Sequence, residues 1–281
     1  MTDGNGARPG ALMAIGGAED KFEEKFILKN FYDLCGGKDA RIAIIPTASK
    51  LEGTGTAYQA IFNSFGVQSV EVLPLFRRAD ANDPAAARVF EQATGIFMTG
   101  GDQNKILAVL GGTESLHAIQ AANDRGAVIG GTSAGASALS DPMISLGKPG
   151  SMARSGMVKL TAGLGLTKTF IVDQHFHQRE RLGRLMYSIM LYPGMIGVGV
   201  DEDTAAILNP GGGCIDVVGR GTVTIVDGSE LKMYNPASVP HLAPMVFSNM
   251  VLHTLTHGCR YSLIDRELEM DRRSAGPDDY C

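Results

Sequence analysis

The sequence has few features that would indicate a metal, membrane or nucleic-acid function. Its 281 residues include only four cysteines, Cys35, Cys214, Cys259 and Cys281, with no C-x-x-C pair. This spacing predicts neither disulfides nor a cysteine metal site. No apolar run approaches the roughly 18 residues that a membrane-spanning helix needs. A net charge of -5 leaves no basic excess for nucleic acid or an acidic membrane surface.

The start of the chain has no basic segment followed by an apolar one, so we expect no secretion signal and a cytoplasmic protein. Residues 1–10 are small and polar and are expected to be disordered, and the polar tail 271–281 is expected to fray. No linker interrupts residues 11–270, which we interpret as a single domain.

Strands and helices alternate through the first half of the chain. Apolar, β-branched runs predict strands at 11–15, 41–46, 69–76, 95–99 and 127–129. Helical spacing predicts helices at 20–34, 57–65, 84–93 and, around a Gly-Gly break, 107–125. This order predicts a doubly wound α/β fold, with a mostly parallel sheet between two helical layers. Ligands of such folds bind outside the carboxyl ends of the strands.

The pattern changes after Ser140. Residues 145–165 are rich in Gly, Ser and Met and are expected to form a long connection with little regular structure. Beyond them the pattern predicts a strand at 170–172, a helix at 178–191, strands at 197–201 and 205–208, a hairpin at 214–226, and a strand pair within 252–263 that breaks at Gly258. We therefore expect a β-rich C-terminal extension on the α/β domain.

The motif Gly131-Thr132-Ser133-Ala134-Gly135 follows a predicted strand and leads into small residues that suit a helix. In this context G-x-S-x-G indicates a nucleophile elbow, where glycines allow a sharp turn and expose the serine at the sheet edge. The N–H groups of the next helix would stabilise an oxyanion there. The alternative is a glycine-rich turn with an incidental serine.

A serine nucleophile needs a base and a group that orients the base. His175 and His177 follow the strand at 170–172, and three acids, Asp201, Glu202 and Asp203, follow the strand at 197–201. Spacing does not choose among the acids, and a solvated acidic turn is the alternative. Two histidines could be half of a metal site, but no cysteine or third histidine completes it. The order Ser, His, acid differs from that of the α/β-hydrolases.

Several motifs together resemble the cyanophycinase family, which is related to dipeptidase E and comprises serine peptidases on a glutamine-amidotransferase-like, flavodoxin-like fold. The matching segments are Ile15–Asp20, Phe97–Gln103, Gly131–Gly135, Asp173–Phe176 with Arg179, Arg181 and Arg184, and Gly199–Glu202. The resemblance spans roughly residues 11–265. It implies Ser133 as nucleophile, His175 as general base and Glu202 as the acid that orients it.

The resemblance also implies a substrate. Cyanophycin is a polyaspartate whose β-carboxyls carry arginine, and the family releases β-Asp-Arg dipeptides from its end. Arginine pairs bidentately with carboxylates, so Arg179, Arg181 and Arg184 are candidates for binding the free carboxylates. Further candidates are Gln103, Asp173 and Gln174 for substrate contacts, and the N–H groups of Gly101 and Ala134 for the oxyanion hole.

Purely structural roles are the alternative for the same residues. The arginine run with Glu180 suits a solvated helix start with paired charges, and Asp102 suits a helix N-cap. The resemblance implies a homodimer and no cofactor. The β-rich extension favours cyanophycinase over the shorter dipeptidase E.

Two rival functions remain from the sequence. One is an aspartyl dipeptidase or isoaspartyl peptidase that acts on short peptides. The other, from a different class, is a non-catalytic binding module on the same scaffold. A cysteine-dependent amidotransferase is disfavoured because the elbow carries serine.

Overall fold

The computed structural model describes residues 8–209, 213–233 and 239–270. Residues 1–7, which make up most of the segment expected to be disordered, lie outside the described residues, and so does the tail 271–281. Gly10 departs from that expectation, because it is buried and its N–H donates to the Asn123 carbonyl at 2.8 Å. The ordered chain therefore begins before the first strand.

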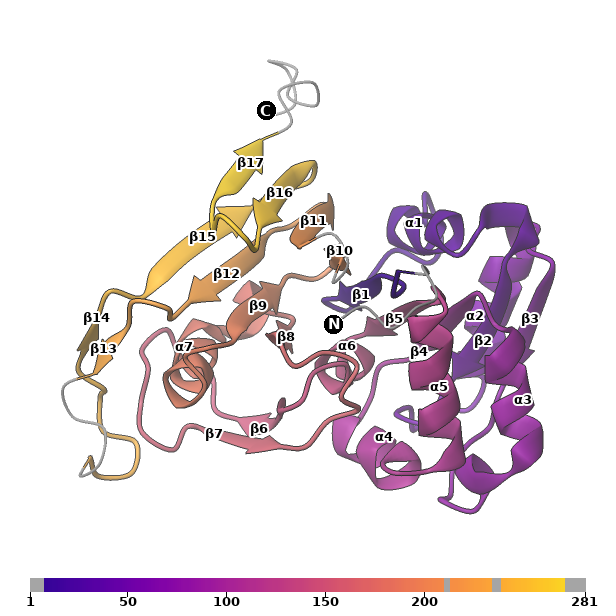
Figure 1. Cartoon of the computed structure of the whole chain (residues 1–281), viewed down its shortest axis with the longest axis horizontal. Coiled ribbons are helices and arrows are strands. Elements are labelled where there is room, and N and C mark those ends of the chain that lie inside the picture. Colours follow the sequence, from indigo (N-terminus) through magenta and orange to yellow (C-terminus); the bar gives the residue numbers. More distant parts are fainter. Residues whose placement is uncertain (1–7, 210–212, 234–238, 271–281) are drawn as a thin grey trace.

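A central sheet runs through the molecule (Figure 1). In the described part of the chain it has nine strands in the order β17-β16-β11-β10-β1-β5-β4-β2-β3. One half is parallel and consists of β1 (Leu12–Ile15), β5 (Val128–Thr132), β4 (Gly95–Met98), β2 (Arg41–Ile45) and β3 (Ser69–Val72). The other half is antiparallel and consists of β10 (Thr204–Asn209), β11 (Cys214–Gly219), β16 (Cys259–Ser262) and β17 (Leu268–Met270).

Helices cover both faces of the parallel half. One face carries α1 (Phe26–Leu34) and α2 (Thr54–Ser64), and the other carries α3 (Pro84–Gln92), α4 (Gln103–Leu110), α5 (Glu114–Asp124) and α6 (Ala134–Ala138). Alternate residues of each strand point to opposite faces. Thus Phe97 of β4 meets Phe31 and Phe62, with ring centroids 5.3 and 5.5 Å apart, while Met98 faces the other layer. Burial of each such side chain contributes about 1.5–3 kcal/mol.

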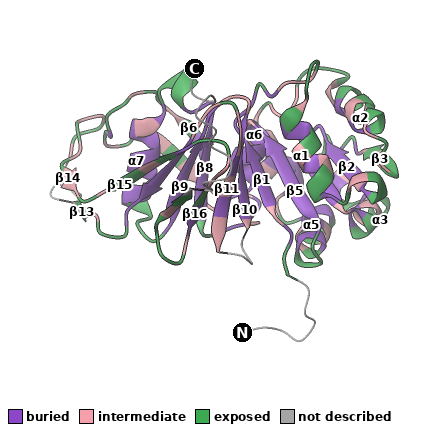
Figure 2. Cartoon of the chain, turned by 90° about the horizontal axis from the view of Figure 1, so that it is seen from above, coloured by how far each residue is buried: buried purple, intermediate pink, exposed green. Residues whose placement is uncertain are grey.

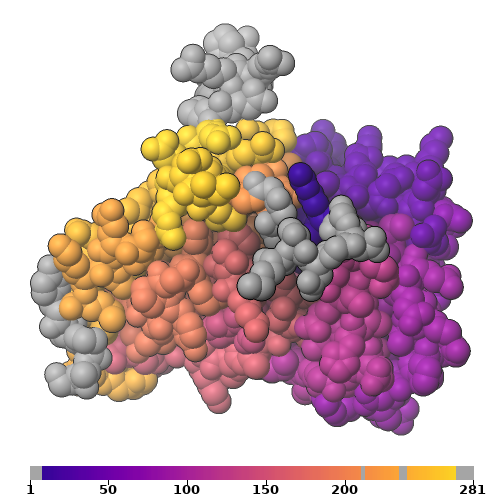
Figure 3. All heavy atoms as spheres, viewed as in Figure 1, coloured from indigo at the N-terminus to yellow at the C-terminus, as the bar shows by residue number. Residues whose placement is uncertain are grey.

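A second sheet lies on the antiparallel half of the first. Its order is β15-β12-β9-β8, with bounds Val251–Leu255, Val223–Asp227, Ile196–Val200 and Phe170–Gln174. Strands of both sheets contribute to one hydrophobic cluster. The second sheet therefore covers a face of the antiparallel half, as helices cover the faces of the parallel half. Its other face is covered by α7 (Leu182–Leu191). Figure 2 shows the buried strands running through both halves, and Figure 3 shows the C-terminal strands in continuous contact with the rest.

The α/β fold, with its partly parallel sheet, two helical layers and β-rich extension, confirms the predicted fold class. Within the described residues, none of the helices has the length and apolar character needed to cross a membrane.

Four local predictions were wrong. The helix expected from residue 20 begins only at Phe26, because the Asp20 carboxylate accepts the backbone N–H groups of Phe22, Glu23 and Lys25. These bonds fold residues 20–25 into a loop that competes with the helix.

The segment expected to be irregular at 145–165 contains most of a hairpin instead, formed by β6 (Met143–Gly147) and β7 (Val158–Thr161). Two further strands, β13 (Lys232–Met233) and β14 (Phe247–Ser248), pair with each other.

The hairpin expected at 214–226 is not one. Both strands exist, but β11 pairs with β10 in the central sheet and β12 pairs with β9 in the second sheet. The strands β15 and β16 at 252–263 separate between the two sheets in the same way. The chain crosses at Gly219, where a Cβ would lie 2.4 Å from the Asp203 carbonyl oxygen.

Candidate active site

The elbow motif forms a sharp turn between β5 and α6. Ser133 occupies the turn with φ 51°, in the left-handed region. A Cβ atom on Gly131 would lie 2.4 Å from the Gly135 carbonyl, and one on Gly135 would lie 2.5 Å from the Met98 carbonyl oxygen. Only glycine fits at these two positions, so the close approach of α6 to β5 and β4 depends on them. The turn leaves the Ser133 hydroxyl at the carboxyl end of the parallel strands.

Ser133, His175 and Glu202 form a continuous hydrogen-bonded chain. The Ser133 Oγ lies 2.9 Å from His175 Nε2, and His175 Nδ1 lies 2.6 Å from Glu202 Oε1. Both distances are those of hydrogen bonds. The Ser133 hydroxyl also lies 3.4 Å from Gln174 Oε1. The arrangement matches that of a serine nucleophile, its base and the group that orients the base.

The three consecutive acids after β9 have different partners. Glu202 contacts His175. Asp201 is buried and accepts hydrogen bonds from the backbone N–H groups of His177 and Thr222, and it pairs with the His177 ring at 2.9 Å. Asp203 accepts the Asp20 N–H. The structure therefore shows which of the three acids contacts His175, a choice that the sequence spacing does not make.

The chain of three residues joins the two sheets. Ser133 follows β5 of the central sheet, whereas His175 and Glu202 follow β8 and β9 of the second sheet. His175 turns away from its strand with φ 47°, and its N–H donates to the Gly16 carbonyl at 2.8 Å. A Cβ on Gly17 would lie 2.5 Å from His175 Nε2. The loop after β1 therefore lies directly against the imidazole.

The His175 side chain is mostly buried, and this burial lowers the pKa of its imidazole. The Glu202 carboxylate opposes the shift, and the positive charge of Arg179 adds to it. At neutral pH the ring is therefore neutral and able to accept a proton.

The Gly100–Gly101 loop lies beside Ser133. A Cβ on Gly100 would be 3.3 Å from Ser133 Cβ, and one on Gly101 would be 2.0 Å from the Ala48 carbonyl oxygen. Gly101 has φ 143°, a conformation that L-residues rarely adopt. Ala134 is the first residue of α6, where backbone N–H groups have no partner within the helix. Both predicted oxyanion donors thus belong to segments that flank Ser133.

Two of the three predicted arginines converge on one carboxylate. Asp173 is completely buried and pairs with Arg184, at 2.5 Å from Nε and from Nη2, and with Arg181 at 3.3 Å. Arg181 also donates to the Gln174 carbonyl. With no exposed surface, Asp173 faces the two guanidinium groups instead of solvent.

Burial lowers the pKa of Arg181 to about 10. The positive charges of Arg184 and Arg179 also lower this pKa, whereas the Asp173 carboxylate raises it. Two guanidinium groups thus share one buried carboxylate, and the charge of Arg179 adds to theirs. A cluster with this charge imbalance favours an incoming anion.

The arginines line a pocket of about 450 Å³ between the β6–β7 hairpin and the start of α7. Its lining consists of Gly147, Pro149, Gln178, Arg179, Glu180, Arg181 and Arg184. The Gln103 amide donates to the carbonyls of Ile144 and Ser145, both at 3.0 Å, so it fastens β6 to the start of α4. Gln103 therefore supports one wall of this region.

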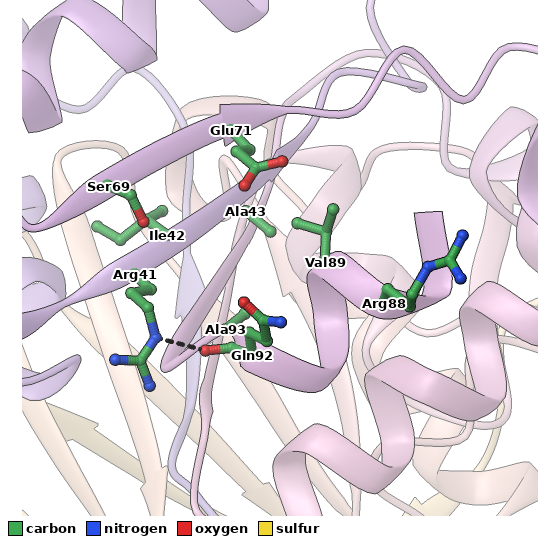
Figure 4. Close-up of a pocket in the computed structure, with 9 residues that line it drawn as sticks. All are labelled: Arg41, Ile42, Ala43, Ser69, Glu71, Arg88, Val89, Gln92 and Ala93. Atoms are coloured by element: carbon green, nitrogen blue, oxygen red, sulfur yellow. Dashed lines mark hydrogen bonds between the residues drawn. The ribbon is translucent and has the colours of Figure 1, made fainter. Parts of the chain in front are cut away.

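A smaller pocket, of about 140 Å³, lies at the opposite end of the sheet (Figure 4). It is bounded by the first residues of β2 and β3 and by the end of α3, where Arg41 donates to the Gln92 carbonyl at 2.7 Å. Its position at the amino ends of the strands separates it from Ser133. Among the described residues, no three His, Cys, Asp or Glu side chains are grouped to hold a metal ion.

The sequence alone assigns no role to a buried acid close to Ser133. Glu19 lies in the loop after β1 and accepts a hydrogen bond from Thr132, the residue before Ser133, at 2.6 Å. Its only sequence signal is its place in the Ile15–Asp20 motif.

Comparison with known families matches residues 11–213 to peptidase family S51. The chain belongs to this family.

The curated relatives include cyanophycinases. Identity is 41% with the cyanophycinase of Geminocystis herdmanii, covering 90% of this chain and 93% of that protein. It is 40% with that of Synechococcus elongatus, covering 92% and 81%, and 38% with that of Trichormus variabilis, covering 91% and 86%. The family resemblance predicted from the motifs is therefore confirmed.

Solved structures show the same fold at low identity. A peptidase from an acI-B1 actinobacterium has a TM-score of 0.67 and 22% identity, covering 92% of this chain and 98% of that chain. A putative peptidase E of Listeria monocytogenes has a TM-score of 0.51 and 16% identity, covering 75% of this chain and 98% of that chain.

Proposed function

We propose that this chain is a cyanophycinase, a serine peptidase that hydrolyses cyanophycin and releases β-Asp-Arg dipeptides from the end of the polymer. The observation that carries the proposal is the hydrogen-bonded chain from Ser133 through His175 to Glu202, beside a pocket lined with arginine. The similarity to curated cyanophycinases supports the substrate.

The reaction begins when Ser133 Oγ attacks the carbonyl carbon of the scissile bond. His175 Nε2 takes the hydroxyl proton, and Glu202 stabilises the resulting imidazolium through Nδ1. The N–H groups of Gly101 and Ala134 are assigned to the oxyanion of the tetrahedral intermediate.

The imidazolium of His175 then gives its proton to the departing amine, and the C–N bond breaks to leave an ester on Ser133. Water, deprotonated by the same imidazole, attacks this acyl-enzyme and frees the carboxylic acid and the serine hydroxyl.

Substrate recognition follows from charge. Each arginine of cyanophycin keeps a free α-carboxylate, and a planar guanidinium binds a carboxylate through two parallel hydrogen bonds. We assign Arg179, Arg181 and Arg184 to these carboxylates. Asp173 holds the last two in place, and Gln103 and Gln174 are assigned to the polar groups of the substrate nearest Ser133.

The rival substrate is a short aspartyl or isoaspartyl peptide. Dipeptidase E-like activity is the alternative because a putative peptidase E shares the fold. That structure leaves about a quarter of this chain unmatched, since it covers 75% of it. The additional chain favours the polymer.

The test is a comparison of substrates with purified protein. Cyanophycin, a synthetic β-Asp-Arg oligomer and α-Asp dipeptides are supplied separately, and the soluble products are identified by mass spectrometry. The proposal predicts β-Asp-Arg from the first two and little from the third. Cleavage of α-Asp dipeptides without attack on the polymer would establish the dipeptidase instead.

A non-catalytic binding module is the alternative from a different class. It predicts that Ser133 does not react with a serine-directed fluorophosphonate. The bond of 2.9 Å to a neutral His175 favours a reactive hydroxyl. A cytoplasmic location and a homodimer remain predictions, which fractionation of cells and light scattering would test.

A further inference from the structure

The loop after β1 touches all three segments that carry the reactive side chains. Gly16 accepts the His175 N–H at 2.8 Å, and Gly17 accepts the Asp203 N–H at 2.9 Å, next to Glu202. Two residues further on, Glu19 is bonded to Thr132, next to Ser133. One short loop therefore joins the elbow of the central sheet to the two strand ends of the second sheet.

Glu19 is the charged group at the centre of this loop. The residue is only 3% exposed, and both of its carboxylate oxygens have partners. Oε2 accepts from the Thr132 hydroxyl at 2.6 Å. Oε1 accepts from the Tyr58 hydroxyl of α2 and pairs with Lys21 at 3.1 Å. Each hydrogen bond to a buried carboxylate is charge-assisted and directional.

The partners of Glu19 are fixed in turn. Tyr58 is buried against Phe97, with ring centroids 4.8 Å apart, and burial beside the carboxylate raises the pKa of its phenol. Lys21 lies over the Tyr58 ring at 5.4 Å. The Glu19 carboxylate is thus hydrogen-bonded to α2 through Tyr58 and to the end of β5 through Thr132.

We propose that Glu19 is a positioning residue for the nucleophile. It touches neither substrate nor Ser133. Through Thr132 it holds the strained turn at Ser133, and through its loop it keeps His175 in line with the hydroxyl. An error of about 1 Å in such an alignment is enough to lower a rate a hundredfold.

The inference rests on Ser133 being the nucleophile, and its test does not depend on the polymer. Glu19→Gln keeps the volume of the side chain but removes its charge, and Thr132→Val removes the hydroxyl but keeps the shape of the residue. The rate of fluorophosphonate labelling of Ser133 is measured for each variant, together with kcat and KM on cyanophycin.

Both variants are expected to lose tenfold or more in labelling rate and in kcat, with KM changed less than about twofold. Thr132→Ser retains the hydroxyl and should restore most of the rate. The double variant Glu19→Gln/Thr132→Val should lose little more than either single variant, because both remove the same interaction.

Asp227→Asn is the matched control. Asp227, the last residue of β12 in the second sheet, is as buried as Glu19, at 3%, and pairs with Arg266, which lies between β16 and β17. Its loss should lower Tm and leave labelling unchanged. If Glu19→Gln and Thr132→Val also label at the wild-type rate and lower only Tm, Glu19 is merely structural and the proposal is overturned. If Glu19→Gln does not fold, a wild-type labelling rate in Thr132→Val alone is sufficient to overturn it.

Discussion

The charge of Arg179 acts on the base without touching it. Its guanidinium lowers the pKa of His175 because it disfavours the protonated imidazole. The folded-state pKa lies below its ordinary value of about 6.5, and activity requires the neutral ring. Removal of the charge in Arg179→Ala lets the ring protonate at higher pH. We therefore expect the acid limb of the kcat/KM profile to move to higher pH.

The control for this shift is Arg77→Ala. Arg77 pairs with Asp80 beyond β3, at the far edge of the central sheet. Its removal should leave the acid limb in place. A downward shift in Arg179→Ala, or an equal shift in both variants, would contradict the assignment.

Asp173 is the residue whose loss should most damage the arginine cluster. Asp173→Ala leaves Arg181 and Arg184 buried without their carboxylate. Loss of one partner from a buried pair typically reduces the free energy of unfolding by about 3–5 kcal/mol. Urea unfolding should detect this loss, and Glu24→Ala, in the exposed pair with Arg220, should show little change. Equal stability of the two variants would show that the cluster does not depend on Asp173.

At the scale of elements, the Gly100–Gly101 loop leaves no room for a side chain at Gly101. Gly101→Ala places a Cβ against the Ala48 carbonyl in a conformation that alanine disfavours. The loop must shift, which displaces the N–H group proposed as an oxyanion donor, and kcat should fall about 10²–10³-fold with a smaller change in KM.

Gly194→Ala is the control for this variant. It adds the same methyl group where nothing lies within 4 Å, and it should leave kcat unchanged. Full activity in Gly101→Ala would remove the Gly101 N–H from the oxyanion hole.

Elements with a strong period could be predicted from sequence, and their partners could not. The parallel strands were predictable from short apolar runs, and the helices α2 to α5 from apolar residues at helical spacing. The elbow was predictable from Gly131 and Gly135 on either side of Ser133. Residues 20–25 failed because side-chain acceptance by Asp20 competes with helical hydrogen bonding. The strands β11 and β12 are close in sequence, yet nothing in their alternation says that they belong to different sheets.

On the scale of the whole molecule, the reactive residues lie where two sheets meet. The second sheet depends on its C-terminal strands, because β12 pairs along the full length of β9, from Ile196 to Val200. A chain that ends before Val223 should therefore lose the alignment of His175 and Glu202, and with it all activity.

The matched truncation ends after Glu267. It removes β17, which pairs only with β16 at the edge of the central sheet among the described strands. Activity should survive this change. An active chain without β12 would show that the second sheet is not needed to hold the base.

The site could be predicted only in part from the sequence, because its residues meet through the packing of the whole molecule. Ser133, two histidines and three acids are candidates from the sequence, but their meeting depends on the packing of β8 against α6 and of β9 against β10. Only the family resemblance selected Glu202, and the structure places that residue against His175. Glu19 received no role because its partners, Tyr58 and Thr132, lie 39 and 113 residues away.

The most direct measurement is digestion of cyanophycin by the wild-type protein and by Ser133→Ala, followed by mass spectrometry of the soluble products. Ser133→Ala removes only the hydroxyl that contacts His175. The account predicts β-Asp-Arg from the wild type and none above background from a folded Ser133→Ala. Release of the dipeptide by both proteins, or by neither, would contradict it.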